Sequence, residues 1–307
     1  MVLAAGRLSL MVPRPFVALG AIEPWAGLAA EHPVARLWTG TAGFNDPVAA
    51  FAYAAGRGHR LSFGLAVGLT PLTGPHEAAA RAAALAATTG RTFCLGVGPG
   101  SVEYQRTLLG APYERPVQAC VDYLRVVRER LAATARHNPA GAGQVELGLG
   151  VLRARMAAAA GEHADFAITW MCPPDHLAAT IVPQIRAGER RSGNGCRVVA
   201  MVPVALSGGS ERERVAAACG THLSAPHYRA ALAEAGISVG PTDSGDLAAL
   251  LAADLVVTDS ERAGAVLERY VAAGADEVVL SPLGTAILAG DECAVADCRR
   301  LMEAVAG

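Results

Sequence analysis

Short apolar runs alternate with longer segments of helical periodicity along the whole chain. The runs are rich in Val, Leu, Ile and Phe and have few polar interruptions, which is typical of strands buried on both faces of a parallel sheet. This pattern predicts the strands Arg7–Val12, Arg36–Gly40, Arg60–Gly68, Arg91–Gly100 with its terminal turn, Gln144–Leu149, Asp165–Trp170, Arg197–Leu206 and Asp276–Ser281.

The segments between these runs begin and end at recognisable helix signals. Asp46 is a candidate cap before Pro47, Gly90 follows the alanine-rich helix that Pro75 opens, and Ser260 is a candidate cap for a late helix. The predicted helices are Gly20–His32, Pro47–Ala55, Pro75–Thr89, Pro116–Arg136, Met156–His163, Pro174–Gly188, Glu211–Cys219, Ala225–Ala235, Asp246–Ala252, Ser260–Ala273 and Asp291–Val305.

The alternation of strand and helix over 307 residues predicts an α/β fold, and it favours a (β/α)8 TIM barrel over a doubly wound sheet. Glycine-rich or polar endings follow many of the strands, as a ring of loops around one site would need. We expect one domain over residues 1–307, with a loop at 139–143 and a helical excursion at 225–254 before the last strand.

Composition narrows the classes of function. All 26 basic residues are arginine, which excludes Schiff-base and lysine general-base chemistry. A formal charge of −2 and a pI near 6.4 do not indicate nucleic acid as a partner. No uninterrupted apolar run has the length of a membrane span, and the start of the sequence does not resemble a signal peptide, so we expect a cytoplasmic protein.

Glycines gather at the ends of two predicted strands. Gly96, Gly98 and Gly100 occupy the glycine-rich turn in which the fourth strand ends, and Gly148 and Gly150 lie at the end of the fifth. Backbone without Cβ atoms lets a flat or phosphorylated ligand approach closely, and exposed N–H groups in such turns form a nest for anions. The alternative is that these turns need glycine for their geometry alone.

Other strand ends add to a candidate cofactor site. A planar ring could lie against the small residues that end the third strand, although close helix packing would also need them. Arg153 precedes a helix N-terminus that suits a phosphate, with a solvated charged turn as the alternative. Trp170 could stack on a ring or fill the barrel. The candidate cofactor-binding residues are Ala66, Val67, Gly68, Gly96, Gly98, Gly100, Gly148, Gly150, Leu152, Arg153 and Trp170.

Acid–base chemistry is poorly represented in the sequence. No Ser-His-Asp or Cys-His constellation and no metal-ligand spacing stands out, and His222 and His227 suit core or surface roles better than ligand binding. This balance is typical of an enzyme whose cofactor brings the reactivity. The candidate catalytic residues are Thr39, Thr41, His76 and Glu103, with Tyr104 beside the last.

Several motifs occur in an order that resembles the luciferase-like flavin-dependent oxidoreductases. They are Leu37-Trp38-Thr39-Gly40, Gly64-Leu65-Ala66-Val67, the segment 90–100, Gly110-Ala111-Pro112, Arg115-Pro116, and the segment 160–165 before Ile168-Thr169-Trp170, with Phe166 where the family usually has glycine. The resemblance implies a TIM barrel with the coenzyme at its C-terminal mouth. It also implies a bulge in the third strand, often with a non-proline cis peptide, behind the coenzyme ring at Ala66, Val67 and Gly68.

Within this family the chain is most similar to the branch that uses the deazaflavin coenzyme F420, through Ile168-Thr169-Trp170, Pro173-Pro174 and Val202-Pro203-Val204. Thr39-Gly40 stands where some family dehydrogenases have an acidic residue and a histidine, which makes alcohol or sugar oxidation doubtful. The segments 148–153, 223–228 and 276–280 also resemble luciferase-like reductases of lanthipeptide gene clusters.

The resemblance leads us to expect a reductase that uses reduced F420. Its expected substrate is a dehydroalanine or dehydrobutyrine residue of a lanthipeptide, which becomes a D-amino acid. An FMN-dependent monooxygenase of a small natural product and a non-catalytic cofactor-binding paralogue are the alternatives. The expected partner is a peptide or small-molecule acceptor rather than nucleic acid or a membrane, with a homodimer as a possible assembly.

Overall fold

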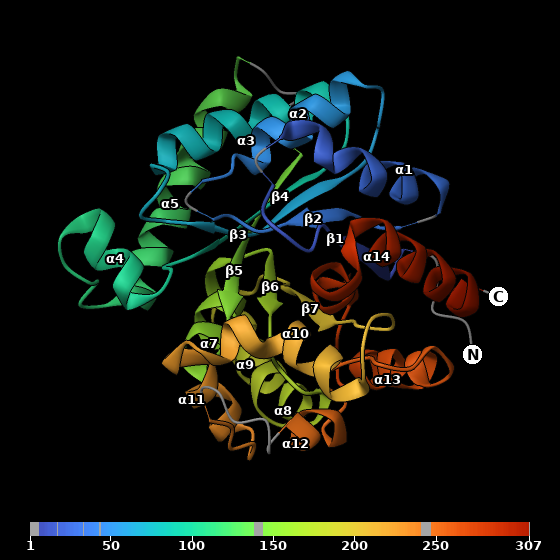
Figure 1. The fold of residues 1–307 in the computed structure, drawn as a ribbon. Coiled ribbons are helices and arrows are strands. Elements are labelled where there is room, and N and C mark those ends of the chain that lie inside the picture. Colours follow the sequence, from blue (N-terminus) through green and yellow to red (C-terminus); the bar gives the residue numbers. More distant parts are fainter. Residues whose placement is uncertain are drawn as a thin grey trace.

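The computed structural model describes residues 6–16, 18–32, 34–42, 44–137, 144–240 and 247–306. Within these ranges, eight parallel strands close into a barrel in chain order, with helices around the outside (Figure 1). The predicted barrel is therefore confirmed. The strands are β1 (Leu8–Met11), β2 (Leu37–Thr39), β3 (Phe63–Leu69), β4 (Phe93–Gly98), β5 (Val145–Val151), β6 (Phe166–Thr169), β7 (Arg197–Pro203) and β8 (Glu277–Ser281).

The helices cover the barrel and continue into an excursion between β7 and β8. The helical segments are η1 (Leu19–Ile22), α1 (Glu23–Glu31), α2 (Pro47–Gly56), α3 (Pro75–Thr89), α4 (Val102–Leu109), α5 (Pro116–Ala135), α7 (Ala154–His163), α8 (Pro174–His176), η2 (Leu177–Ile181), α9 (Val182–Ser192), α10 (Glu211–Leu223), α11 (Pro226–Glu234), α12 (Leu247–Ala252), α13 (Ser260–Ala272) and α14 (Leu283–Ala306). None of them is long and apolar enough to cross a membrane in the part of the chain that is described.

Helix ends mostly follow the predicted signals. Asp46 caps α2 by accepting a hydrogen bond from the Ala49 N–H at 3.0 Å. The cap of α13 is Asp259, one residue before the predicted Ser260, because its carboxylate accepts from the Glu261 N–H at 2.8 Å.

Three helices differ more from the prediction. Helix α4 was not expected, α7 begins at Ala154 rather than Met156, and α14 begins at Leu283 and breaks at Gly290, where φ is 86°. The excursion contains α11 and α12 as predicted, whereas the expected loop at 139–143 and the expected start of a helix at Asp246 lie outside the described residues.

The interior of the barrel is packed by large side chains that lie over glycines of neighbouring strands. A Cβ added to Gly64 would lie 2.3 Å from the Trp38 ring, and one added to Gly148 would lie 2.2 Å from the Phe166 ring. Trp38 and Phe166 contact each other edge to face, with ring centroids 5.7 Å apart. These glycines are therefore required by packing inside the barrel.

Charged side chains close the N-terminal end of the barrel. Glu277, only 2% exposed, accepts hydrogen bonds from Ser9 at 2.6 Å, Trp38 at 2.8 Å and Arg36 at 2.6 Å. Arg197 lies 3.1 Å from the same carboxylate and also pairs with Glu146. Each of these polar groups has a partner, as burial at the base of a barrel demands. The N-terminal end is thus sealed by this network.

Candidate functional site

The third strand carries an irregularity at its C-terminal end. The register with β4 shifts between Leu65 and Gly68, and the Ala66–Val67 peptide bond is cis. Ala66 and Val67 both pack against the cluster inside the barrel, although neighbours in a regular strand point to opposite faces. The bulge and the non-proline cis peptide expected from the sequence are confirmed.

Val67 lies over one glycine of the neighbouring strand β4 and one glycine of the next strand, β5. A Cβ on Gly98 would lie 2.9 Å from one Val67 methyl group, and a Cβ on Gly150 would lie 3.1 Å from the other. Val67 and Gly150 are part-exposed, whereas Gly96 and Gly148, one pleat deeper, are buried. The C-terminal mouth of the barrel therefore has a floor of backbone and small side chains.

The predicted cofactor glycines divide into two groups by depth. Gly96 and Gly148 lie under barrel side chains, because a Cβ on Gly96 would be 2.5 Å from Ile168 and 2.4 Å from the Leu65 carbonyl. Their side-chain-free surface is covered by protein, which corrects the prediction that they contact a ligand. Gly100 and Gly150 are part-exposed at the mouth, and Gly98 is buried only beneath the part-exposed Val67 side chain, so these three glycines stay candidates for ligand contact.

Two helix N-termini face this mouth with different capping. At α4, Gly100 has φ of 72° and Ser101 caps the helix by accepting from the Tyr104 N–H at 3.1 Å. At α7, the N-cap residue Arg153 is extended and makes no side-chain cap hydrogen bond. The N–H groups of the first turn of α7 are therefore uncapped by a side chain, and such groups suit a phosphate.

Arg153 and Leu152 border this helix end. The Arg153 guanidinium is about half exposed and lies 3.1 Å from the Glu234 carboxylate of α11, while Leu152 is part-exposed. A partner this exposed can exchange for a ligand phosphate at small cost, because surface ion pairs contribute about 0 to 1 kcal/mol. The placement of Arg153 thus agrees with the phosphate role predicted for it.

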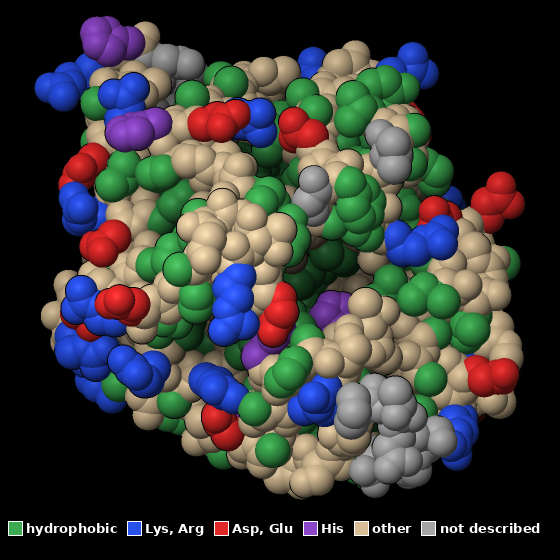
Figure 2. Space-filling model, turned by 60° about the vertical axis from the view of Figure 1, so that its left-hand side comes forward, with side chains coloured by type: hydrophobic (Ala, Val, Ile, Leu, Met, Phe, Trp, Pro, Cys, Tyr) green, Lys and Arg blue, Asp and Glu red, His purple; other side chains and the backbone are tan. Residues whose placement is uncertain are grey.

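The side of the molecule that carries α4 and α11 is hollowed. Figure 2 shows a deep opening on this side with hydrophobic side chains on its walls and histidine and acidic side chains at its edge. Trp170 follows β6 and packs against both the cluster inside the barrel and the cluster around α10 to α12. It therefore connects the barrel mouth to the helical excursion.

Three further aromatic rings extend from Trp170 into the excursion. The His222 ring lies 4.9 Å from the Trp170 ring and 5.1 Å from the Tyr228 ring, and the His227 ring lies 4.4 Å from Tyr228. We call Trp170, His222, His227 and Tyr228 the ring cluster. The sequence prediction gave both histidines core or surface roles, so it missed that α10 and α11 bring them to Trp170.

Titratable groups at the mouth have perturbed pKa values. Burial lowers the pKa of His222 to about 4, with a smaller contribution from His227. Burial also lowers the pKa of His227, against an opposing effect of Glu103. The pKa of Glu103 is lowered, chiefly by hydrogen bonds from its own backbone N–H and from Ser101. Glu103 is therefore an ionised carboxylate at neutral pH and a poor proton donor.

Three of the predicted catalytic residues lie away from the ring cluster. Thr39 is 1% exposed, and since Trp38 points into the barrel, Thr39 faces the helix layer and cannot reach a ligand at the mouth. His76 is exposed in the first turn of α3. The structure thus corrects the expectation that Thr39 contacts substrate, and it brings only Glu103 near the ring cluster.

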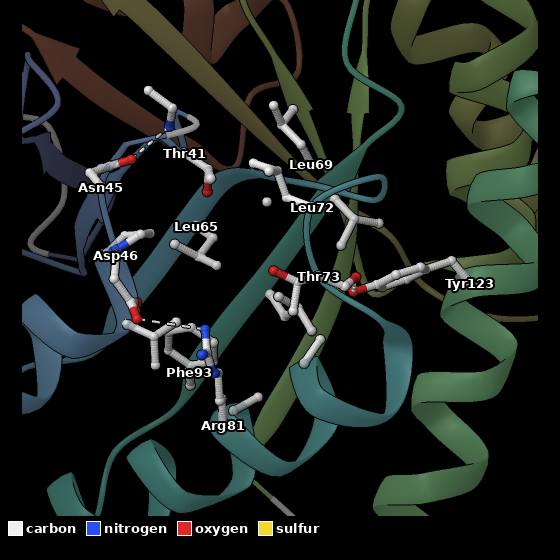
Figure 3. Close-up of a pocket in the computed structure, with 18 residues that line it drawn as sticks. Thr41, Asn45, Asp46, Leu65, Leu69, Leu72, Thr73, Arg81, Phe93 and Tyr123 are labelled. Atoms are coloured by element: carbon white, nitrogen blue, oxygen red, sulfur yellow. Dashed lines mark hydrogen bonds and ion pairs between the residues drawn. The ribbon is translucent and has the colours of Figure 1, made fainter. Parts of the chain in front are cut away.

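Thr41 lines a different cavity, of about 190 Å³, between the outer face of β3 and β4 and helices α2 and α3 (Figure 3). Its walls include Leu65, Phe93 and Ala82, which belong to the core between barrel and helices. Arg81 is balanced there by Asp46 at 3.6 Å and Glu77 at 2.8 Å. This cavity lies behind the β3 bulge and outside the barrel, and Thr41 contributes to its lining.

The residues at the mouth fit a flat ligand with a phosphate-bearing tail. Val67 lies over Gly98 and Gly150, and a side chain at either glycine would collide with it. The N-terminus of α7, which no side chain caps, follows directly after β5. The apolar walls suit a ring, and the exposed Arg153 suits an anion.

Solved structures share this fold across nearly the entire chain. An F420-dependent secondary alcohol dehydrogenase in complex with an F420-acetone adduct aligns with TM-score 0.70 and 15% identity, covering 98% of this chain and 99% of that one. A coenzyme F420-dependent tetrahydromethanopterin reductase from Methanopyrus kandleri aligns with TM-score 0.70 and 16% identity, covering 98% of each chain. A monooxygenase from Streptomyces bottropensis aligns with TM-score 0.71 and 17% identity, covering 98% of this chain and 97% of that one.

Identities this low establish the fold alone, and no curated protein sequence matches the chain. A family model gives the firmer result, because the model described as luciferase-like monooxygenase matches residues 2–237. The match spans β1 to β7 and includes the bulge, the glycines at the mouth and Trp170. This chain belongs to the luciferase-like monooxygenase family.

Proposed function

We propose that this chain is a reductase that uses the reduced deazaflavin coenzyme F420 and acts on a carbon–carbon double bond conjugated with a carbonyl group. The observation that carries the proposal is the floor of the mouth, where Val67 lies over Gly98 and Gly150. This floor offers a flat ring a surface of backbone and one small apolar side chain, with the uncapped start of α7 within the same mouth for a phosphate.

The coenzyme, when bound, would supply the hydride. The chain's own part is to hold two reacting carbons in near contact and to exclude water, which is the main requirement of hydride transfer. Ala66 and Val67 would back the ring, and Arg153 would pair with the phosphate. Apart from the charged network at its N-terminal end, the described interior of the barrel holds a cluster of apolar side chains that includes Trp38 and Phe166, which agrees with this division of labour.

The preference for F420 over FMN rests on the Ile168-Thr169-Trp170 ending and the two proline motifs that follow it. Two of the structural neighbours described above use F420, and a third is a monooxygenase. An FMN-dependent monooxygenase is therefore the second candidate function, and a cofactor-binding paralogue without activity is the third.

A dehydroalanine or dehydrobutyrine residue of a lanthipeptide is the substrate we favour within this class. The segment 223–228, one of those that resemble the lanthipeptide reductases, joins α10 to α11 and carries His227 and Tyr228 to the ring cluster. A peptide acceptor, or a small molecule with the same conjugated group, is accordingly the proposed partner, and a homodimer is the proposed assembly.

Titration of the purified chain with F420 and FMN side by side tests the cofactor. Anaerobic mixing with reduced F420 and N-acetyldehydroalanine methylamide then tests the reaction, followed by the visible absorbance of the oxidised coenzyme. Oxidation that requires the acceptor supports the reductase. Turnover that needs FMN and oxygen would establish the monooxygenase instead, and binding without turnover of any acceptor would establish the paralogue.

A further inference from the structure

The ring cluster contains two ring nitrogens that lack hydrogen-bond partners. Trp170 Nε1 and His222 Nδ1 are both buried, and neither has a partner among the described residues. Their rings contact each other at 4.9 Å, at an interplanar angle of 63°. Buried polar atoms are nearly always hydrogen-bonded, so two adjacent exceptions in one place indicate a missing partner.

The position of these nitrogens ties them to the mouth. Trp170 packs against the same interior cluster as Ala66 and Val67, which form the proposed wall behind the coenzyme ring. His222 lies on the other side of Trp170, toward α11. A molecule that lies on this wall would therefore have the Trp170–His222 edge beside it. Both residues are part-exposed, although the two nitrogen atoms themselves are buried.

The charge state of the pair limits what it can bind. The indole N–H is a donor only, and burial keeps His222 neutral at physiological pH, since it lowers its pKa to about 4. With its proton on Nδ1, His222 is a second donor. Two neutral donors match an oxygen that carries partial or developing negative charge, such as that of an amide or ketone carbonyl, better than a fixed anion, which would favour a cation.

We infer that Trp170 Nε1 and His222 Nδ1 bind the carbonyl oxygen of the acceptor and stabilise the negative charge that develops on it. The inference rests on the proposed function and deepens it by naming the part of the substrate that the chain recognises.

The reduction needs no acid or base from the chain besides these two hydrogen-bond donors. Hydride adds to the β-carbon of the conjugated double bond, the π electrons move toward the carbonyl, and the oxygen acquires the enolate charge. The Trp170 and His222 N–H groups donate to that oxygen. A proton from water then adds to the α-carbon as the carbonyl re-forms, so one hydride and one proton are consumed for each double bond reduced.

The test compares variants that remove each donor with one that restores it. Trp170→Phe keeps an aromatic ring without the N–H, and His222→Phe does the same for the imidazole. His222→Asn keeps an amide N–H near the position of Nδ1. The control is His137→Gln, at an exposed histidine after α5. Each protein is mixed anaerobically with reduced F420 and saturating N-acetyldehydroalanine methylamide, and its F420 dissociation constant and thermal midpoint are measured separately.

We expect Trp170→Phe and His222→Phe to slow single-turnover hydride transfer about a hundredfold each, as loss of one oxyanion donor does elsewhere. Coenzyme affinity and thermal midpoint of the His222 variants should stay within the range of the control. His222→Asn should recover at least tenfold of the rate lost in His222→Phe. A purely structural role would not produce this recovery at unchanged coenzyme affinity.

The contrary outcomes separate the inference from the proposed function. If the wild type reduces the acceptor and all variants do so within twofold of it, the inference is wrong and the reductase stands. If the rate falls only in proportion to lost coenzyme affinity or stability, the ring cluster is structural and the inference is also wrong. If the wild type binds reduced F420 but reduces no acceptor, the proposed function itself fails.

Discussion

Alanine substitutions at Gly98 and Gly148 should have opposite consequences, although both glycines belong to barrel strands, Gly98 at the end of β4 and Gly148 within β5. At Gly148 the new methyl group would lie 2.2 to 2.4 Å from three atoms of the Phe166 ring. Phe166 is fully buried, with Trp38 against its ring and the Arg197 guanidinium 5.7 Å from its centre. The ring cannot move aside, so we expect a loss of about 3 kcal/mol, at the upper end of overpacking costs.

At Gly98 the new methyl group would meet only the end of the Val67 side chain, at 2.9 Å. Val67 is part-exposed and can change rotamer, so the cost in folding stability should be about 1 kcal/mol or less. The displaced Val67 and the methyl group would together thicken the floor of the mouth. Coenzyme affinity should therefore fall by about tenfold or more, which corresponds to about 1.4 kcal/mol.

Two measurements distinguish the variants. Urea unfolding followed by tryptophan fluorescence gives the change in stability, and titration with F420 gives the change in affinity. Gly27→Ala is the control, because its Cβ meets nothing within 4 Å and the substitution lies inside α1. It should gain about 0.5 to 1 kcal/mol from helix propensity and leave binding unchanged.

Either of two results would refute this reasoning. A Gly98→Ala protein with wild-type affinity for F420 would mean that the coenzyme does not lie on the Val67 floor. A Gly148→Ala protein as stable as the wild type would mean that the barrel interior is looser than the contact between Phe166 and Gly148 indicates.

Three further predictions follow from contacts described above. Arg153→Ala should weaken F420 binding more than riboflavin binding, measured by parallel titration, because riboflavin lacks a phosphate; equal losses would remove the phosphate role. Glu277→Gln should destabilise the fold by about 3 kcal/mol in urea unfolding, since Arg36 and Arg197 would lose a buried counter-charge, and an unchanged midpoint would contradict this. The pKa of His222 is about 4 in the folded protein and near 6.5 in the unfolded chain, so the folded protein binds fewer protons between these values. The free energy of unfolding should therefore decrease by about 3 kcal/mol as the pH drops from 6.5 to 4. His222→Asn should reduce that slope, and an identical pH profile in both proteins would exclude the shift.

The sequence was sufficient to predict the barrel because the information is local and repeated. Each strand is a short apolar run, and each following helix has its own start and stop signals, such as Asp46 before α2 and Gly90 after α3. The bulge at Ala66 and Val67 came from family resemblance rather than from periodicity. The short helix α4 was missed because it has only eight residues directly after a glycine-rich turn, and the one side chain that it buries is the polar Gln105.

The candidate site was predicted less well, because in strands that are buried on both faces the sequence does not show which side chains point into the barrel and which point to the helices. Without alternating polar positions, the sequence does not reveal that Thr39 points away from the barrel interior, or that Gly96 and Gly148 lie beneath large side chains. The ring cluster was missed for another reason. His222 and Trp170 are 52 positions apart, and only the packing of α10 over the barrel mouth brings them together.

The network of Arg36, Glu146, Arg197 and Glu277 closes the N-terminal end of the barrel, so among the described residues a ligand of the Val67 floor has to enter from the C-terminal mouth. A ligand on the Val67 floor must bind before a second ligand that stacks above it. The first ligand can dissociate only after the second has left. Kinetics with two substrates should consequently follow a compulsory sequence, and excess of the outer substrate should trap the inner one.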